Sequence, residues 1–252
     1  APPPGDGLSA STYPSDAYEE FRDQSRAWQA ITGYFAFGTP DDTRLTGLAV
    51  PQAATSLMVI GNFFQVLGVK PLLGNLFSPD DSRTGAHPVT LLANAFWKRQ
   101  FNADPSIVGK EIDMNGKPVT VIGVLPESFD FGAAFAPGTK VDLFKPLNLD
   151  ESRDWGNIVT LIGRLKPGVT LKQAFDDAVR VAPNLYFSMK FPDTRGRYKN
   201  RLIPVALKDY ITGKLHRSLT ALCCAVGAIL LIAGVNLSNL LLARGPARSR
   251  EF

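Results

Sequence analysis

Cysteine and histidine are scarce in this chain, and their scarcity excludes most metal sites. The 252 residues include two cysteines and two histidines. His87 and His216 lie far apart in sequence, and no HExxH or CxxC spacing is present, so no metal site is predicted. The adjacent Cys223 and Cys224 fall inside a hydrophobic run. We interpret them as small apolar residues rather than as a disulfide or a pair of metal ligands.

The phosphate-binding and nucleophile motifs of common enzymes are also missing. No GxxxxGK[ST] loop is present, so the chain is not expected to bind ATP through a Walker loop. No GxSxG motif occurs, and no Ser-His-Asp order is supported. The sequence therefore predicts no catalytic residue, no cofactor and no enzyme activity. A membrane-anchored hydrolase is the interpretation with the least support.

Charge is absent from one long stretch, residues 218–243. Arg217 and Arg244 bound these 26 residues, which are mainly Leu, Ile, Val and Ala. A helix rises about 1.5 Å per residue, so about 20 apolar residues cross a hydrocarbon core of about 30 Å. We therefore predict a transmembrane helix over 219–243. The alternative is a buried helix of a large soluble protein, whereas the length and place of the run argue against a signal peptide.

Basic residues flank this run on both sides and predict its orientation. Arg244, Arg248 and Arg250 follow it, whereas Lys214 and Arg217 precede it. The positive-inside rule then favours a cytoplasmic C-terminus, with the residues before the run on the extracytoplasmic side.

The net charge of +4 comes entirely from the C-terminal part of the chain. Residues 193–252 carry 10 Lys and Arg against 3 Asp and Glu, whereas residues 1–192 carry 17 against 20. Nucleic-acid binding is therefore not expected. Lipid headgroups explain part of the basic excess near the membrane better.

The residues before the run show the pattern of an α+β domain. Ala1-PPPGDGLSAS predicts a disordered lead over 1–12. The strongest hairpin signal is Asn115-Gly116, and Thr170 with Gln173 forms a capping box. Strands are predicted at 31–37, 45–60, 88–93, 110–114, 117–126, 141–147, 158–165 and 201–207. Helices are predicted from Ser15, which is the candidate cap of the first, and at 62–68, 94–101 (capped by Asn94) and 171–182. We predict a mixed-sheet domain over 13–208, built from two subdomains.

One aromatic segment stands out as a candidate partner surface. Phe129, Phe131 and Phe135 are interspersed with Gly, Ala and Pro in a predicted loop. Exposed phenylalanines there predict contact with a partner, and packing in the core is the alternative. In contrast, Phe63 and Phe64 are interpreted as core residues.

Small and amide side chains in the predicted transmembrane helix indicate packing against another helix. Ala221, Ala225 and Ala228 share one face, which allows close helix approach in lipid. Asn236 and Asn239 lie three residues apart, where amides bond to a neighbouring helix. Because the chain contains one such run, it is expected either to oligomerise or to be part of a longer protein.

Four blocks of sequence together resemble a known family. They are Asn62-FFQVLGVKPLLGNLF, Pro88-VTLLANAFWKRQFNADPSIVGKEIDMNGKPVTVIGVLPESFDF, Leu161-IGRLKPGVTLKQA and Val235-NLSNLLLARGPARSRE. In this order they resemble the MacB-like periplasmic core domain and the following helix of FtsX-like ABC-transporter permeases, over roughly residues 13–252. Pro183 departs from the continuous helix usual in that region. The resemblance also implies a membrane helix ahead of Ala1 and further segments after Phe252.

The resemblance implies a non-enzymatic role in the bacterial inner membrane. Residues 13–208 would be the periplasmic head, 209–218 a juxtamembrane coupling segment, 219–243 the transmembrane helix, and 244–252 the cytoplasmic start of a continuation. An ATPase on the same or a separate chain would drive the motion that this part transmits, for export or efflux.

The partners implied are the membrane, the ABC ATPase, a second permease copy or paired permease, and a periplasmic adaptor. The alternative left open is a free-standing, single-pass, membrane-anchored periplasmic binding module. In that case the alanine face, Asn236 and Asn239 would serve a homodimer.

Overall fold

Contacts along the chain define two units in the computed structural model, Ala1–Pro204 and Val205–Phe252. The structure describes residues 12–36, 41–46, 51–136, 138–156, 158–184 and 204–248. The predicted disordered lead therefore lies almost wholly outside the described residues. The contacts do not divide the first unit into the two subdomains that the sequence predicts.

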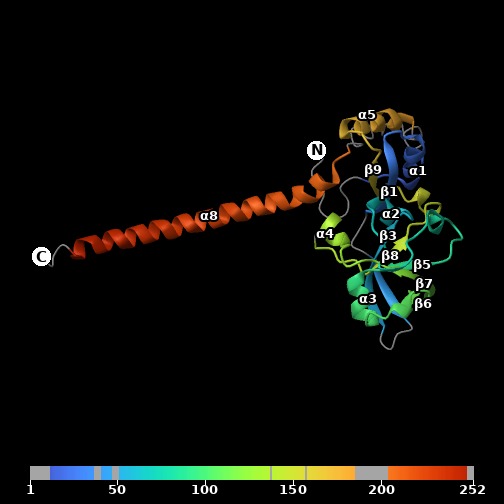
Figure 1. Ribbon diagram of the computed structural model, residues 1–252, viewed down its shortest axis with the longest axis horizontal. Helices are drawn as coiled ribbons and strands as arrows, with labels where there is room; N and C mark the ends of the chain where they lie inside the picture. The colour runs from blue at the N-terminus through green and yellow to red at the C-terminus, as the bar shows by residue number, and fades with distance from the viewer. Residues whose placement is uncertain are drawn as a thin grey trace. The chain divides into compact units, whose positions relative to one another are not determined.

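The first unit contains strands with helices between some of them (Figure 1). The strands are β1 (Trp28–Phe35), β2 (Asp41–Thr46), β3 (Gln52–Val59), β4 (Leu73–Gly74), β5 (Val89–Leu92), β6 (Glu111–Met114), β7 (Lys117–Val124), β8 (Leu143–Pro146) and β9 (Val159–Leu165). The helices are α1 (Ser15–Gln24), α2 (Phe63–Leu67), α3 (Asn94–Phe101), α4 (Phe131–Phe135) and α5 (Leu171–Val181). Short 3-10 helices lie at Pro79–Ser82, Pro105–Ile107, Glu151–Asp154 and Ala182–Asn184.

Six of the strands close into a ring. Neighbours in the order β2-β6-β7-β5-β8-β3 are hydrogen-bonded, and β2 also pairs with β3. β1 extends the sheet from β3, β9 pairs with β1, and β4 pairs with β7. The β3–β8 and β5–β7 pairs are parallel and the others antiparallel. The predicted mixed sheet is therefore confirmed.

Several predicted turns and ends form as the local sequence indicates. Asn115 and Gly116 adopt positive φ angles of 56° and 78° between β6 and β7, as a tight hairpin requires. Gly68, at φ 77°, ends α2 in the left-handed conformation. Thr170 and Gln173 form the predicted capping box of α5. This helix ends at Val181, before Pro183, in a 3-10 turn.

Three local predictions are wrong. Pro14, not Ser15, is the N-cap of α1, and Ala93, not Asn94, is the N-cap of α3. The third is the strand predicted at 201–207. Its first three residues lie outside the described chain, the next three have no regular structure, and the last, Leu207, begins a helix.

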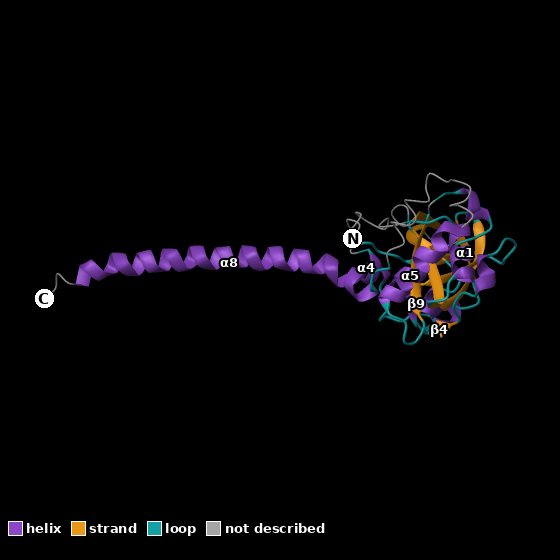
Figure 2. Ribbon diagram, turned by 90° about the horizontal axis from the view of Figure 1, so that it is seen from above, coloured by secondary structure: helices purple, strands orange, loops and turns teal. Residues whose placement is uncertain are grey.

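Buried residues of the described part of the chain form three apolar clusters around the sheet. One joins α1 and α5 to β1 and β9, and includes Tyr18 and Phe21. An aromatic cluster centres on Phe63 and Phe64 of α2. The third fills the strand ring under α3 and includes Phe96. Figure 1 shows α1 and α5 beside β9 and β1, and Figure 2 shows strands surrounded by helices.

The second unit contains one long helix, α8 (Leu207–Arg248), of 42 residues. The predicted coupling segment at 209–218 and the predicted span at 219–243 both belong to it, and 249–252 lie outside the described residues. Side chains are described at 204–211 and 220–236. Within the described part of the chain, no helix is both long and apolar enough to cross a membrane.

Candidate functional site

The aromatic segment predicted as an exposed loop is instead part of the core. Phe131 and Phe135 belong to the short helix α4 and are 2% and 3% exposed. Their ring centroids lie 5.1 Å and 5.7 Å from that of Tyr34. The Asp130 side chain caps this helix by accepting a hydrogen bond from the Ala133 N–H at 3.2 Å. The prediction of exposure is therefore wrong for both phenylalanines.

Phe129, the first residue of that segment, is partly buried. Its ring lies 5.5 Å from Phe64 and 6.0 Å from Phe144, centroid to centroid. No observation tests the predicted partner contact of Phe129, Phe131 and Phe135, so it stays a prediction. Because Phe131 and Phe135 are buried, only the exposed part of the Phe129 side chain is available for direct contact with a partner.

The residues predicted to pack one membrane helix on another lie on α8. Ala221, Ala225, Ala228 and Asn236 are exposed within this unit. The Asn239 side chain lies outside the described part. Their exposure leaves them available for a partner helix, and the packing itself stays a prediction.

Large apolar side chains occur along the same helix. Leu230, Leu231 and Ile232 are consecutive, so they point to different sides of α8, and they are 66%, 72% and 62% exposed. A helix that is apolar on all sides is typical of one buried in protein or in lipid. These side chains make the described part of the α8 surface largely apolar.

A network of charges holds α1 against two 3-10 segments. Glu19 of α1 contacts Arg83 at 2.8 Å and Arg153 at 2.7 Å. Arg83 also contacts Asp150 at 3.2 Å. The backbone N–H of Thr84 and the Arg83 charge lower the pKa of Asp150. Every charge in this network has an opposite partner, which indicates a structural role rather than catalysis.

A second ion pair supports the strand ring. Asp142 precedes β8, and its side chain is 6% exposed beside Arg99 at 2.8 Å and Lys140 at 3.3 Å. The Thr55 N–H of β3 also donates to this carboxylate at 3.2 Å. Burial raises the pKa of Asp142, but the bonds from Arg99 and Thr55 outweigh it and lower the pKa. The carboxylate therefore stays ionised as a link between α3, β3 and β8.

The described residues contain no group of three His, Cys, Asp or Glu side chains placed to hold a metal ion. The exposed His87 ring nitrogen Nε2 lies 2.9 Å from the Thr120 hydroxyl. Cys223 and Cys224 are exposed free thiols on α8. None of these side chains forms an arrangement with catalytic chemistry.

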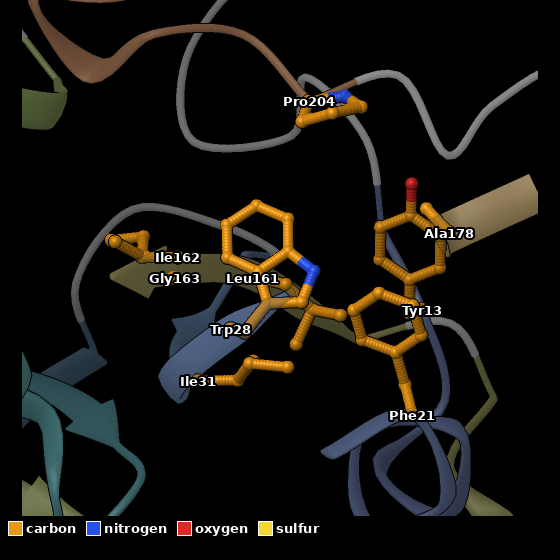
Figure 3. Close-up of a pocket in the computed structure, with 9 residues that line it drawn as sticks. All are labelled: Tyr13, Phe21, Trp28, Ile31, Leu161, Ile162, Gly163, Ala178 and Pro204. Atoms are coloured by element: carbon orange, nitrogen blue, oxygen red, sulfur yellow. The ribbon is translucent and has the colours of Figure 1, made fainter. Parts of the chain in front are cut away.

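A small pocket lies where α1 and α5 cover β1 and β9 (Figure 3). It has a volume of about 100 Å³. Its walls are aromatic and aliphatic, and they include Tyr13, Phe21, Trp28, Ile31, Leu161 and Ala178. Several wall residues are partly exposed, so the pocket opens to solvent.

Sequence reasoning did not find this pocket, although one signal for it was present. Gly163 lies inside β9, and an isolated glycine within a strand often marks a close approach. A Cβ at this position would lie 2.4 Å from the Trp28 ring. The indole therefore lies flat on β9 because residue 163 has no side chain.

The chain is similar to several known proteins. The family model of the MacB-like periplasmic core domain matches residues 2–181. The macrolide export ATP-binding/permease protein MacB of Burkholderia thailandensis is 24% identical over 225 residues, which cover 87% of this chain and 32% of that protein. The chain thus spans about a third of the length of this curated relative.

One solved structure shows the same fold, and a second is less similar. A domain of a putative permease protein from Porphyromonas gingivalis has a TM-score of 0.53 and 15% identity, covering 73% of this chain and 75% of that one. The periplasmic region of MacB from Actinobacillus actinomycetemcomitans has a TM-score of 0.49 and 20% identity, covering 69% and 74%. Because the family model matches well over half of the residues, the chain belongs to the MacB-like periplasmic core domain family.

Proposed function

We propose that this chain is the extracytoplasmic head and coupling helix of an ABC-transporter permease, located in the bacterial inner membrane. Membership of the MacB-like periplasmic core domain family carries this proposal. The relative from Burkholderia thailandensis is named as a macrolide export ATP-binding/permease protein. By analogy the chain would serve export or efflux, without a catalytic residue of its own.

The charge-free residues 218–243 support the membrane location. Their length of 26 residues exceeds the roughly 20 that a hydrocarbon core of about 30 Å requires. The exposed Leu230, Leu231 and Ile232 of α8 would face lipid or another helix there. The three arginines that follow favour a cytoplasmic C-terminus.

The continuity of α8 supports a mechanical role. Its 42 residues run without a break from Leu207 to Arg248, a length of about 60 Å at 1.5 Å per residue. A continuous helix of this kind would move as a rigid body. ATP-driven movement at its cytoplasmic end would therefore be transmitted to the preceding domain, which is the mechanotransmission proposed here.

A second helix would pack on the alanine face of α8. Ala221, Ala225 and Ala228 allow close approach, and the amides of Asn236 and Asn239 would hydrogen-bond across the interface. The partner would be a second copy or a paired permease. An ABC ATPase subunit or domain would supply the energy, and a periplasmic adaptor would contact the head.

Topology can be tested with single cysteines in the full-length protein, after Cys223 and Cys224 are replaced by alanine. A cysteine at Glu127, whose side chain is 79% exposed on the head, should react with a membrane-impermeant maleimide in intact spheroplasts. A cysteine at Arg250 should react only after lysis. Reaction of both sites before lysis, or of Glu127→Cys only after lysis, would refute the proposed orientation.

Coupling can be tested in the same cysteine-free protein together with its ATPase. A cysteine at Asn236 should form a disulfide between copies, with a yield that changes on adding ATP and vanadate. The control is an ATPase variant that binds but does not hydrolyse ATP. A yield that is independent of nucleotide would favour the free-standing anchored module over the permease.

A further inference from the structure

Helix α5 is attached to the sheet by small apolar side chains. Its buried residues are Ala174, Ala178 and Val181, whereas Phe175 and Val179 are only partly buried. An alanine contributes a single methyl group, and apolar stabilisation grows with the area removed from water. The apolar attachment is therefore weak for a helix of 11 residues.

Packing beneath this helix is also incomplete. The pocket of about 100 Å³ lies where α5 covers β1 and β9, and Ala178 forms part of its wall together with Trp28 (Figure 3). An open pocket leaves apolar wall atoms without the close contacts that a protein interior normally provides. The burial that would stabilise α5 on the sheet is missing there.

Polar contacts supply the remaining attachment, and they gather at one place. Within the described part of the chain, the hydrogen bonds that join α5 to segments distant in sequence come from Asp177 and Arg180. The Asp177 carboxylate accepts three of them, from residues 25–27, at 2.7 Å, 2.8 Å and 2.9 Å. Arg180 Nη2 donates to the Gln24 carbonyl at 3.0 Å. Both side chains therefore bind the same turn between α1 and β1.

The Asp177 contacts are strong and depend on each other. Water competes little for them, because the Asp177 side chain is only 9% exposed. Hydrogen bonds to a charged group contribute more than neutral ones, and a donor left without an acceptor is costly. Loss of this one carboxylate would thus break several contacts at once. The attachment of α5 depends on Asp177 more than on any single apolar residue of the helix.

We propose that α5 is a releasable strap, which opens away from β1 and β9 as a unit when the Asp177 contacts break, while the strand ring stays folded. Segments with few buried apolar contacts open locally at a lower free energy than the core. The ring differs from α5, because each of its strands is hydrogen-bonded to two neighbours and its core contains Leu45 and Phe96. Opening would expose the apolar wall of the pocket. The inference concerns the head alone, so its test does not depend on the proposed transport role.

Hydrogen–deuterium exchange of the whole protein in nanodiscs tests the strap. The helical amides of residues 174–181 should exchange at least about tenfold faster than those of β5 and β7 in the ring. Because a local opening exposes little surface, urea below the unfolding transition should hardly change the exchange of α5, whereas it should accelerate that of the ring. Both measurements use the wild-type protein, so they decide the proposal even where a variant fails to fold.

A matched pair of variants tests the part played by Asp177. Asp177→Asn should raise the exchange of α5 by about tenfold, since either orientation of the amide leaves donors without an acceptor. The control is Asp176→Asn, because Asp176 is 57% exposed in an ion pair with Lys172, and it should change the exchange by about twofold or less. The proposal is overturned if α5 exchanges as slowly as the ring, if urea accelerates both equally, or if folded Asp177→Asn behaves like Asp176→Asn.

Discussion

The Asp177 carboxylate on α5 accepts a hydrogen bond from the Ser25 hydroxyl at 2.7 Å, across 152 residues of sequence. The same oxygen accepts from the backbone N–H groups of Arg26 and Ala27 at 2.8 Å and 2.9 Å. Arg180 contacts the other oxygen at 2.6 Å. One side chain thus joins α5 to the turn between α1 and β1.

Replacing this carboxylate should destabilise the head. Asp177→Asn removes the charge and replaces one of two accepting oxygens by an NH₂ donor, which then faces either the Arg180 guanidinium or the backbone N–H groups. Either orientation leaves donors without an acceptor, which costs about 1–3 kcal/mol. Thermal unfolding of the detergent-solubilised protein measures the loss. The control is Asp176→Asn, since Asp176 is 57% exposed and pairs only with Lys172 in an ion pair on the helix surface, worth about 0.5 kcal/mol or less. Equal losses in the two variants would contradict the role given to Asp177.

The Asp177 carboxylate should also make the free energy of unfolding depend on pH. Burial raises the pKa of Asp177, but the bonds from Ser25, Ala27, Arg180 and Arg26 outweigh it and lower the pKa from 3.8 to about 2. Because the pKa of Asp177 is lower in the folded state than in the unfolded state, the ionised carboxylate stabilises the fold at pH values above the unfolded pKa. This contribution is lost as the pH falls toward 2. The difference in stability between wild type and Asp177→Asn should therefore shrink by about 2 kcal/mol from pH 6 to pH 2. A constant difference across this range, measured by denaturant unfolding, would exclude the lowered pKa.

Truncating the buried phenylalanines of α4 should act on stability and not only on partner binding. Phe131→Ala leaves a cavity beside Tyr34 and should cost about 3–5 kcal/mol. Phe129→Ala should cost less, because Phe129 is only partly buried. Unfolding measurements on both variants test this order. If Phe131→Ala unfolds at the same temperature as wild type, Phe131 is not a core residue, and the prediction of an exposed contact residue would be correct.

The two asparagines of α8 should support association of the helix in membranes. Replacing both Asn236 and Asn239 by alanine removes the amides that would bond across the interface, each worth about 0.6–2 kcal/mol in lipid. Crosslinking between copies in native membranes should fall several-fold. Leu231→Ala, at a neighbouring exposed position without an amide, should leave the yield unchanged. If the crosslinking yield of the double variant equals that of wild type, the two asparagines do not contribute to the interface.

Local sequence alone was sufficient for features that depend on a few adjacent residues. Asn115-Gly116 specified its hairpin because both turn positions need positive φ, which these two residue types tolerate. Thr170 and Gln173 satisfied each other's backbone groups within one turn of helix. The four resembling blocks also indicated the family correctly. Such signals need no knowledge of distant segments.

Tertiary structure decided the features that depend on residues far apart in the chain. Phe131 and Phe135 resemble loop residues in sequence, but the ring of Tyr34, about 100 positions earlier, packs against both of them. Pairing of β2 with both β3 and β6 closes a ring that no local pattern predicts. The Asp177 contacts and the Trp28 pocket arise in the same way. Sequence patterns determined most of the helical and extended segments and the charge-free run, because backbone preferences and hydrophobic periodicity are local. The assembled fold determined which side chains meet, because packing depends on the whole chain.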